Sequence, residues 1–134
     1  MKAKAIFLAS ALALAGPALA ADAAGALAGY QAEARKADAA FSPSASRGAQ
    51  FFSARHGGEW SCSSCHGAPP TGQGKHAKTG KAIAPLAPAA NAERFTDAAR
   101  TEKWFRRNCN DVLGRACSGA EKADVLAYLL QARP

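Results

Sequence analysis

The pentapeptide Cys62-Ser63-Ser64-Cys65-His66 constrains this chain more than any other feature of its sequence. Its C-x-x-C-H pattern is the attachment signature of a c-type haem. Residues three positions apart lie on one face of a helical turn, so both thiols can reach the two vinyl groups on one edge of a porphyrin. Histidine is a common proximal ligand of haem iron, and the adjacent imidazole lies within reach of it. The motif predicts one haem c, attached through Cys62 and Cys65, with His66 as the proximal ligand.

Two other chemistries use closely spaced cysteines, and the residues favour neither of them. A zinc site would need two further ligands, which His56 and His76 could supply. However, Cys65 and His66 are adjacent and cannot easily share one tetrahedral site. A thioredoxin-like redox pair is expected within a βαβ pattern, and the residues around this pair show no strand alternation. A covalently attached haem is therefore the preferred interpretation.

The N-terminus has the pattern of a secretory signal peptide. Lys2 and Lys4 form a charged region, residues 6–14 are a short apolar run, and Ala18-Leu19-Ala20 fits the small-x-small rule for cleavage. The apolar run is shorter than the roughly 20 residues that a membrane span requires. We therefore expect residues 1–20 to be cleaved and residues 21–134 to form a single monohaem domain. We expect that domain to lie in the periplasm without a membrane span.

The chain contains four cysteines, and Cys109 and Cys117 lie outside the haem motif. Cysteines in a periplasm tend to be oxidised, which makes these two a natural disulfide pair. In one continuous helix they would lie about 12 Å apart, whereas the Cα atoms of a disulfide lie within about 7 Å of each other. We therefore expect a helix to end between them, at Gly114.

Apolar periodicity and helix-boundary residues predict a mainly helical chain. A first helix is expected over residues 22–37. A second helix is expected to begin with Ser42 as its N-cap and Pro43 in its first turn, and to end at Gly57-Gly58. Residues 67–91 contain four prolines and four glycines, so we expect an irregular segment there that packs around the haem.

Two further helices are expected in the C-terminal part of the chain. The first begins with Thr96 as its N-cap, followed by Asp97 in its first turn, and it places Asn108 on its apolar face. The second begins at a capping box formed by Ser118 and Glu121. It is expected to pack on the N-terminal helix through four aliphatic residues: Val125, Leu126, Leu129 and Leu130.

The chain is basic, with a formal net charge of +7. An exported chain rarely meets nucleic acid, so we expect no nucleic-acid partner. Four basic residues close together in the sequence either form an ordinary solvated helix face or steer the chain toward an acidic redox partner. The sequence favours neither of these two interpretations. The residues are Arg100, Lys103, Arg106 and Arg107.

The second axial ligand decides what a haem site does. Electron-carrying cytochromes c commonly use methionine, but the only methionine here is Met1, within the expected signal peptide. The remaining candidates are His56, His76, a lysine, Asn108 or an open position. Asn108 lies on an inward face, where a polar amide needs a partner. Hydrogen bonding to the backbone would satisfy the amide equally well, so the residues alone leave the choice open.

Four segments of the chain share a pattern beyond the haem motif. They are Ile83-Ala84-Pro85-Leu86-Ala87-Pro88, Arg94-Phe95-Thr96-Asp97, Arg107-Asn108-Cys109-Asn110, and Gly114-Arg115 leading to Cys117. Together they resemble the sphaeroides haem protein family of small, high-spin, class I-type cytochromes c. The resemblance extends from about Tyr30 to Leu130.

The resemblance implies an all-α, class I cytochrome c-like fold, with helices wrapped around one haem. It implies that Asn108 is the distal ligand of ferric iron, and that Cys109 and Cys117 form a disulfide. It also implies that Asn108 leaves the iron on reduction, so that oxygen, nitric oxide or another small ligand can bind. A dihaem or multihaem c-type cytochrome would donate the electron.

The chemistry of an amide ligand agrees with this behaviour. An amide oxygen is a hard, weak-field donor that suits Fe(III) better than Fe(II), so its bond to iron should weaken on reduction. Two alternatives stay open. The chain could be a simple periplasmic electron carrier with His56 or His76 as a strong second ligand, or it could be a reductase of a small oxygen or nitrogen species.

Overall fold

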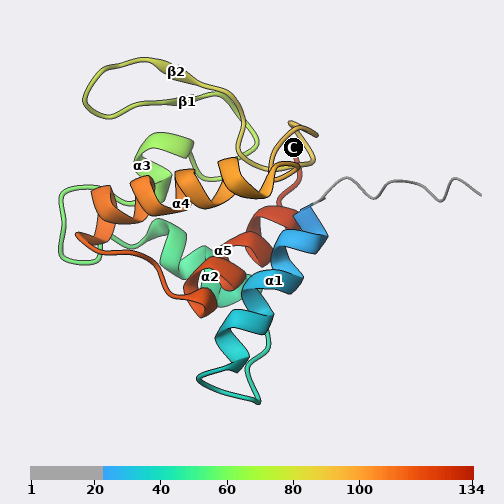
Figure 1. The fold of residues 1–134 in the computed structure, drawn as a ribbon. Helices are drawn as coiled ribbons and strands as arrows, with labels where there is room; N and C mark the ends of the chain where they lie inside the picture. The colour runs from blue at the N-terminus through green and yellow to red at the C-terminus, as the bar shows by residue number, and fades with distance from the viewer. Residues whose placement is uncertain (1–22) are drawn as a thin grey trace, which may run out of the picture.

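The computed structural model of the chain describes residues 23–134, so the predicted signal peptide lies outside the described residues. Within this range the fold is helical, as predicted, and no helix is both long and apolar enough to cross a membrane. Figure 1 shows the elements in order: α1 (Ala23–Arg35), α2 (Ala45–Ser53), α3 (Cys62–His66), β1 (Gly74–Lys75), β2 (Ala82–Ile83), α4 (Ala98–Leu113) and α5 (Gly119–Gln131).

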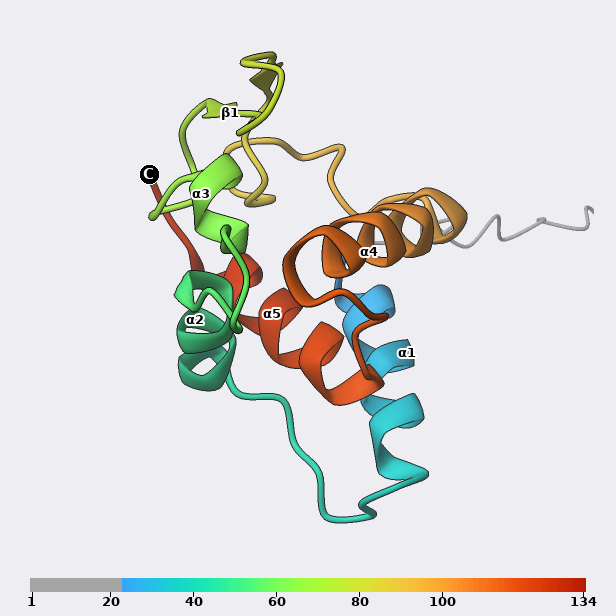
Figure 2. The same ribbon diagram turned by 90° about the vertical axis from the view of Figure 1, so that its left-hand side faces the viewer.

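The last helix, α5, lies between α1 and α2 and packs against both, as Figures 1 and 2 show. The predicted packing on the N-terminal helix is therefore confirmed, although Leu130 is only half-buried. Helices α2 and α5 are in close contact at Gly48, where a Cβ would collide with the carbonyl oxygen of Asp124. The central hydrophobic cluster lies at this crossing and consists of Phe52, Val125 and Leu129.

Helix α2 begins later than the sequence predicted. Its N-cap is Ser44, whose hydroxyl accepts a hydrogen bond from the Arg47 backbone N–H at 3.3 Å. The prediction of Ser42 as the cap was wrong because a carboxylate of α5 fixes the start of the helix. Asp124 accepts the Ser44 backbone N–H at 2.7 Å and pairs with the Arg47 guanidinium at 2.7 Å. The helix also ends at Ser53, before the predicted stop at residues 57–58.

Helix α4 is capped by Asp97 and not by the predicted Thr96. The Asp97 carboxylate accepts the Arg100 backbone N–H at 2.8 Å. The Thr96 hydroxyl instead donates back to the carbonyl oxygen of Glu93, also at 2.8 Å. The side chain that accepts a first-turn N–H is therefore that of Asp97, and the helix begins one residue later than predicted.

The connection between α4 and α5 matches the prediction. Gly114 ends α4 in a left-handed conformation, with φ of 70°. Cys109 and Cys117 form a disulfide across this turn, with their Cα atoms 5.6 Å apart. The predicted capping box opens α5, since the Ser118 hydroxyl accepts the Glu121 N–H and the Glu121 carboxylate accepts the Ser118 N–H.

A short antiparallel hairpin was not predicted. It pairs Gly74 with Ile83 and Lys75 with Ala82. Two-residue strands are too short to show the alternation that identifies a strand in a sequence. The hairpin packs on α3, because at Gly74 a Cβ would collide with the backbone carbonyl of Cys65.

Candidate haem site

The haem motif forms helix α3, which the serines between and before the cysteines hold in place. The Ser61 hydroxyl accepts the Ser64 N–H at 3.2 Å, and the Ser64 hydroxyl accepts the Ser61 N–H at 3.0 Å. This reciprocal capping box satisfies two donors at the helix start. It places Cys62 and Cys65 on one helical turn, and neither cysteine is in a disulfide.

A cavity of about 590 Å³ lies between α3, α4, α5 and the hairpin. Its volume is typical of a site for an organic cofactor. Cys62, Cys65 and His66 line it from α3, and Asn108 lines it from α4. Apolar side chains supply much of the remaining wall, among them Phe52, Leu86, Phe95, Phe105, Val125 and Leu129.

The His66 side chain is suited to bind a metal. Burial, together with the nearby charge of Arg94, lowers the pKa of His66 to about 4, so its imidazole is neutral at ordinary pH. Neutral imidazole is the form that ligates metals. The ring makes no hydrogen bond to any residue in 23–134, and its Nδ1 atom is buried without a partner. An unpartnered buried nitrogen is costly, which is consistent with a ring reserved for a cofactor.

The two thiols differ in their surroundings. Burial raises the pKa of Cys62 to about 11, which keeps this thiol neutral. The Cys65 sulfur accepts a hydrogen bond from the Ala77 backbone N–H, at 3.3 Å, on the hairpin. Conversion of both thiols to thioethers would bury no charge, so the site fits covalent attachment of a porphyrin.

Asn108 lies half-buried on the cavity wall, next to the disulfide residue Cys109. Its side chain forms no hydrogen bond with the part of the chain that the structure describes. The structure therefore does not show the alternative role for Asn108, a side-chain hydrogen bond to the backbone near the end of α4. The amide is free to meet a group inside the cavity.

The two candidate histidines lie in different places. His56 does not line the cavity, because its Nε2 atom is 2.8 Å from the Phe51 carbonyl oxygen and its ring packs on the Phe51 ring at 4.2 Å. His76 does line the cavity, from the hairpin that packs on α3. Its Nδ1 atom accepts the N–H groups of Lys78 and Thr79, each at 3.3 Å. Only its other ring nitrogen remains available.

Basic side chains on the cavity wall form a group that sequence reasoning partly missed. Lys78 lies 4.8 Å over the Trp60 ring, and Arg107 lies 5.2 Å over the Trp104 ring. Arg94 belongs to one of the segments that resemble the sphaeroides haem protein family, and nothing in its local sequence indicates a role of its own. The structure brings four basic residues to the wall: Lys78, Arg94, Arg100 and Arg107.

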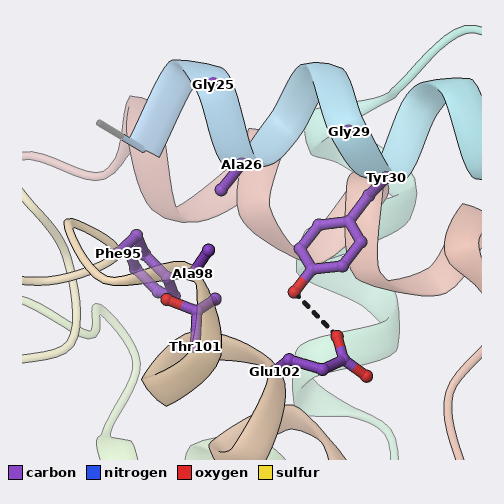
Figure 3. Close-up of a pocket in the computed structure, with 8 residues that line it drawn as sticks. All are labelled: Gly25, Ala26, Gly29, Tyr30, Phe95, Ala98, Thr101 and Glu102. Atoms are coloured by element: carbon purple, nitrogen blue, oxygen red, sulfur yellow. Dashed lines mark hydrogen bonds between the residues drawn. The ribbon is translucent and has the colours of Figure 1, made fainter. Parts of the chain in front are cut away.

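A second, smaller hollow of about 310 Å³ lies between α1 and α4 (Figure 3). Its polar end is closed by the Tyr30 hydroxyl, which donates to the Glu102 carboxylate at 3.1 Å. Lys122 from α5 also pairs with Glu102, at 2.9 Å. Phe95 and Thr101 line both this hollow and the large cavity, so the two spaces share a wall.

A scan of protein families matches residues 38–129 to a domain of unknown function, DUF1924. Among related proteins, the cytochrome c-type protein SHP of Cereibacter sphaeroides is 52% identical over 130 residues, which are 92% of this chain and 95% of that protein. Cytochrome c'' of Methylophilus methylotrophus is 47% identical over 92 residues, which are 66% of this chain and 64% of that protein.

Solved structures agree with these relatives. Oxidised cytochrome c'' from Methylophilus methylotrophus has a TM-score of 0.75 at 40% identity, over 84% of this chain and 95% of that one. Oxidised SHP, described as an oxygen-binding cytochrome c, has a TM-score of 0.71 at 48% identity, over 80% of this chain and 94% of that one. A solution structure of cytochrome c'' addresses haem-ligand detachment in that protein.

Proposed function

The chain belongs to the DUF1924 family and is a c-type cytochrome with one haem, and from this premise we propose that it binds a small ligand under the control of Asn108. The ligand is oxygen, nitric oxide or another small molecule. The residues that act are Cys62 and Cys65 as thioether attachments, His66 as proximal ligand and Asn108 as distal ligand of the ferric state.

The haem, when bound, supplies an iron that changes between Fe(III) and Fe(II) and accepts a small ligand. The chain's own residues support its placement from one side. Cys62 and Cys65 present two thiols from a single turn, and the neutral imidazole of His66 faces the same cavity. This arrangement supports monohaem attachment at α3.

Asn108 reaches the cavity from the opposing helix, α4. Its amide oxygen is a hard donor that favours Fe(III), so Asn108 should leave the metal on reduction. The freed amide would remain on the cavity wall, where it can hydrogen-bond a small ligand. The adjacent disulfide residue Cys109 restrains the backbone at this point of α4.

The observation that carries the proposal is the free Asn108 amide on the wall of the cavity that His66 also lines. An amide bonded to the backbone would have to break that bond before it could ligate iron. No such competitor exists within the described residues. SHP, the relative described as an oxygen-binding cytochrome c, shares 48% identity with this chain and supports the same class of ligand.

Visible absorption spectra of the haem-loaded protein test the proposal. We expect high-spin bands in the ferric protein and an immediate change when carbon monoxide is added to the ferrous protein. Asn108→Ala should change the ferric spectrum and leave the carbon monoxide response in place. An unaltered ferric spectrum in this variant would sink the assignment.

His76→Ala is the matched control, because His76 is the candidate histidine that lines the cavity. We expect this variant to keep the ferric spectrum of the unmodified protein. If instead the unmodified protein shows low-spin bands that His76→Ala abolishes, a simple electron carrier with His76 as the second ligand would replace our proposal.

We propose that the electron donor is a dihaem or multihaem c-type cytochrome with an acidic face, which docks on α4. Trp104 is 46% exposed on this helix and also lines the cavity, so a docked partner would lie next to the cofactor. Arg107 packs over the Trp104 ring, and Lys103 and Arg106 are exposed. Electron-transfer rates should therefore fall as ionic strength rises. Rates that do not depend on salt would contradict this docking site.

We further propose that the chain is exported to the periplasm and cleaved after Ala20. The pattern of residues 1–20 supports this. The intact mass of the haem-loaded protein, recovered from the periplasmic fraction, should correspond to residues 21–134 plus one haem. A mass that includes the first twenty residues would contradict the cleavage.

A further inference from the structure

We infer that the Arg94 guanidinium binds a propionate carboxylate of the haem. Arg94 lies half-buried on the wall of the large cavity, between the irregular segment and the start of α4. Its Nε atom donates to the Pro85 carbonyl oxygen at 2.8 Å, and its Nη2 atom donates to the Ala84 carbonyl oxygen at 2.7 Å. The guanidinium is therefore held in one orientation before any cofactor arrives.

The charge of Arg94 has no counterpart within residues 23–134. Four of the nine acidic residues there pair with other cations, and no carboxylate of the nine lies within ion-pair distance of Arg94, including those of Glu93, Asp97 and Asp111 on the cavity wall. Burial lowers the pKa of Arg94, which indicates that the site disfavours an isolated cation. Its two carbonyl bonds leave further N–H donors of the guanidinium unused. A nearby anion would stabilise a partly buried cation of this kind.

The other basic residues on the cavity wall are placed differently. Arg100 lies 3.9 Å from Asp97, and its side chain is 68% exposed. Lys78 and Arg107 are exposed and lie over tryptophan rings. Among the four basic residues on the wall, Arg94 alone is both partly buried and fixed by backbone carbonyls.

The backbone next to Arg94 is strained in a way that serves this placement. Phe95 has φ of 64°, in the left-handed region that a bulky residue rarely adopts. In ordinary extended backbone, successive side chains point to opposite faces, whereas Arg94 and Phe95 both line the cavity. Strain of this kind is retained where the surrounding structure requires it, and functional sites are the usual place.

The chemistry of the cofactor matches the site. A c-type haem brings two propionates, and its vinyl groups are consumed by the thioethers. A guanidinium offers paired N–H donors that match the two oxygens of a carboxylate. The inference rests on the haem alone and does not depend on the role of Asn108.

A crystal structure of the haem-loaded ferric protein tests the inference directly. We expect an Arg94 nitrogen about 2.7–2.9 Å from a propionate oxygen, the usual length of a charge-assisted hydrogen bond. If both propionates face solvent or pair with Arg100 or Arg107, the inference is wrong. This test needs no variant, so it decides the question even if substitutions at Arg94 prevent folding.

Variants measure the strength of the contact. In Arg94→Gln, carbon-13 NMR of labelled haem should show that the pKa of one propionate is raised by about one to three pH units, because the opposite charge that favoured its ionised form is lost. The propionate-bending band in the resonance Raman spectrum should shift as well. Arg94→Lys keeps the positive charge but loses the paired N–H donors of the guanidinium, so the pKa of the propionate should rise less in this variant than in Arg94→Gln.

The matched control is Arg106→Gln, which removes an equal charge from an exposed position on α4 that does not line the cavity. We expect the propionate pKa values in this control to equal those of the unmodified protein. If the propionate pKa values in Arg94→Gln also equal those of the unmodified protein, the inference is wrong. The ferric absorption bands, which report on Asn108, are read in the same samples and separate the two proposals.

Discussion

Replacement of Asp124 by asparagine should weaken the contact between the start of α2 and α5 and destabilise the fold. Asp124 is 7% exposed, and its carboxylate takes hydrogen bonds from α2 and its N-cap residue. The Ser44 backbone N–H donates to Oδ1 at 2.7 Å, while the Arg47 guanidinium donates to Oδ2 at 2.7 Å and to Oδ1 at 2.8 Å. The substitution keeps the size of the side chain and removes its charge.

The magnitude follows from how exposed each partner is. A hydrogen bond to a charged group contributes about 1.5–3 kcal/mol and a neutral one about 0.5–1.5 kcal/mol. The asparagine amide oxygen can still accept the Ser44 N–H, so this bond loses about 1–1.5 kcal/mol. The Arg47 side chain is 54% exposed, so solvent screening limits its ion pair to about 0–1 kcal/mol. The expected loss in the free energy of unfolding is therefore about 1–2.5 kcal/mol. That corresponds to a fall in Tm of roughly 4–10 °C for a domain of this size.

The assay is denaturant unfolding of the haem-loaded protein, followed by circular dichroism. Because the haem is covalent, it stays attached in the folded and unfolded states. Asp97→Asn is a suitable control, since the Asp97 carboxylate also accepts a backbone N–H at the start of a helix but the side chain is 48% exposed; we expect a loss of about 1 kcal/mol or less. If the free energy of unfolding of Asp124→Asn lies within about 0.5 kcal/mol of that of the unmodified protein, as for an ordinary surface substitution, our reasoning about the contact between Asp124 and the start of α2 is wrong.

Three further perturbations test other parts of the molecule. Cys117→Ser opens the disulfide to Cys109 and should lower the free energy of unfolding by about 2–3 kcal/mol in a denaturant titration; no change would argue that the turn holds without it. The hydrogen bond from Arg115 holds the pKa of Glu121 below its usual range, so this carboxylate stabilises the fold above its unfolded pKa of about 4.3. That stabilisation is lost as pH falls through the lowered value, so Glu121→Gln should lose less stability than the unmodified protein in thermal melts between about pH 5 and pH 2. Gly74→Ala would place a Cβ against a backbone carbonyl of the haem motif, so it should cost about 1–3 kcal/mol and speed hydrogen exchange in the hairpin, whereas unchanged exchange would contradict this contact.

Helix boundaries were predictable where their determinants are local in sequence. The capping box of Ser118 and Glu121 and the stop at Gly114 are set by residues within a few positions, and both were predicted correctly. The start of α2 was not, because its determinant is Asp124, eighty residues away in the chain. At Thr96, two local hydrogen bonds compete, and the sequence does not show which of them forms.

The same distinction between local and distant determinants applies to the residues of the candidate site. The spacing of Cys62, Cys65 and His66 is a local pattern, and the structure brings all three to one cavity. The separation of His56 from the cavity depends on a backbone carbonyl that no sequence pattern reveals. Arg94 was missed for a similar reason, since its position depends on carbonyl groups in another segment.

The burial of α5 has a consequence for how sequences in this family can diverge. Residues 122–127 are buried without interruption, which is more than one full turn of helix, so every face of α5 contacts protein there. A substitution on any side must fit existing neighbours, and few will be tolerated. Helix α4 and the irregular segment contact solvent or the cavity over much of their surface, and their exposed positions can accept change at little cost in stability. Functional variation among relatives should therefore accumulate around the cavity, while the sequence of α5 should change slowly because its residues are buried on all sides.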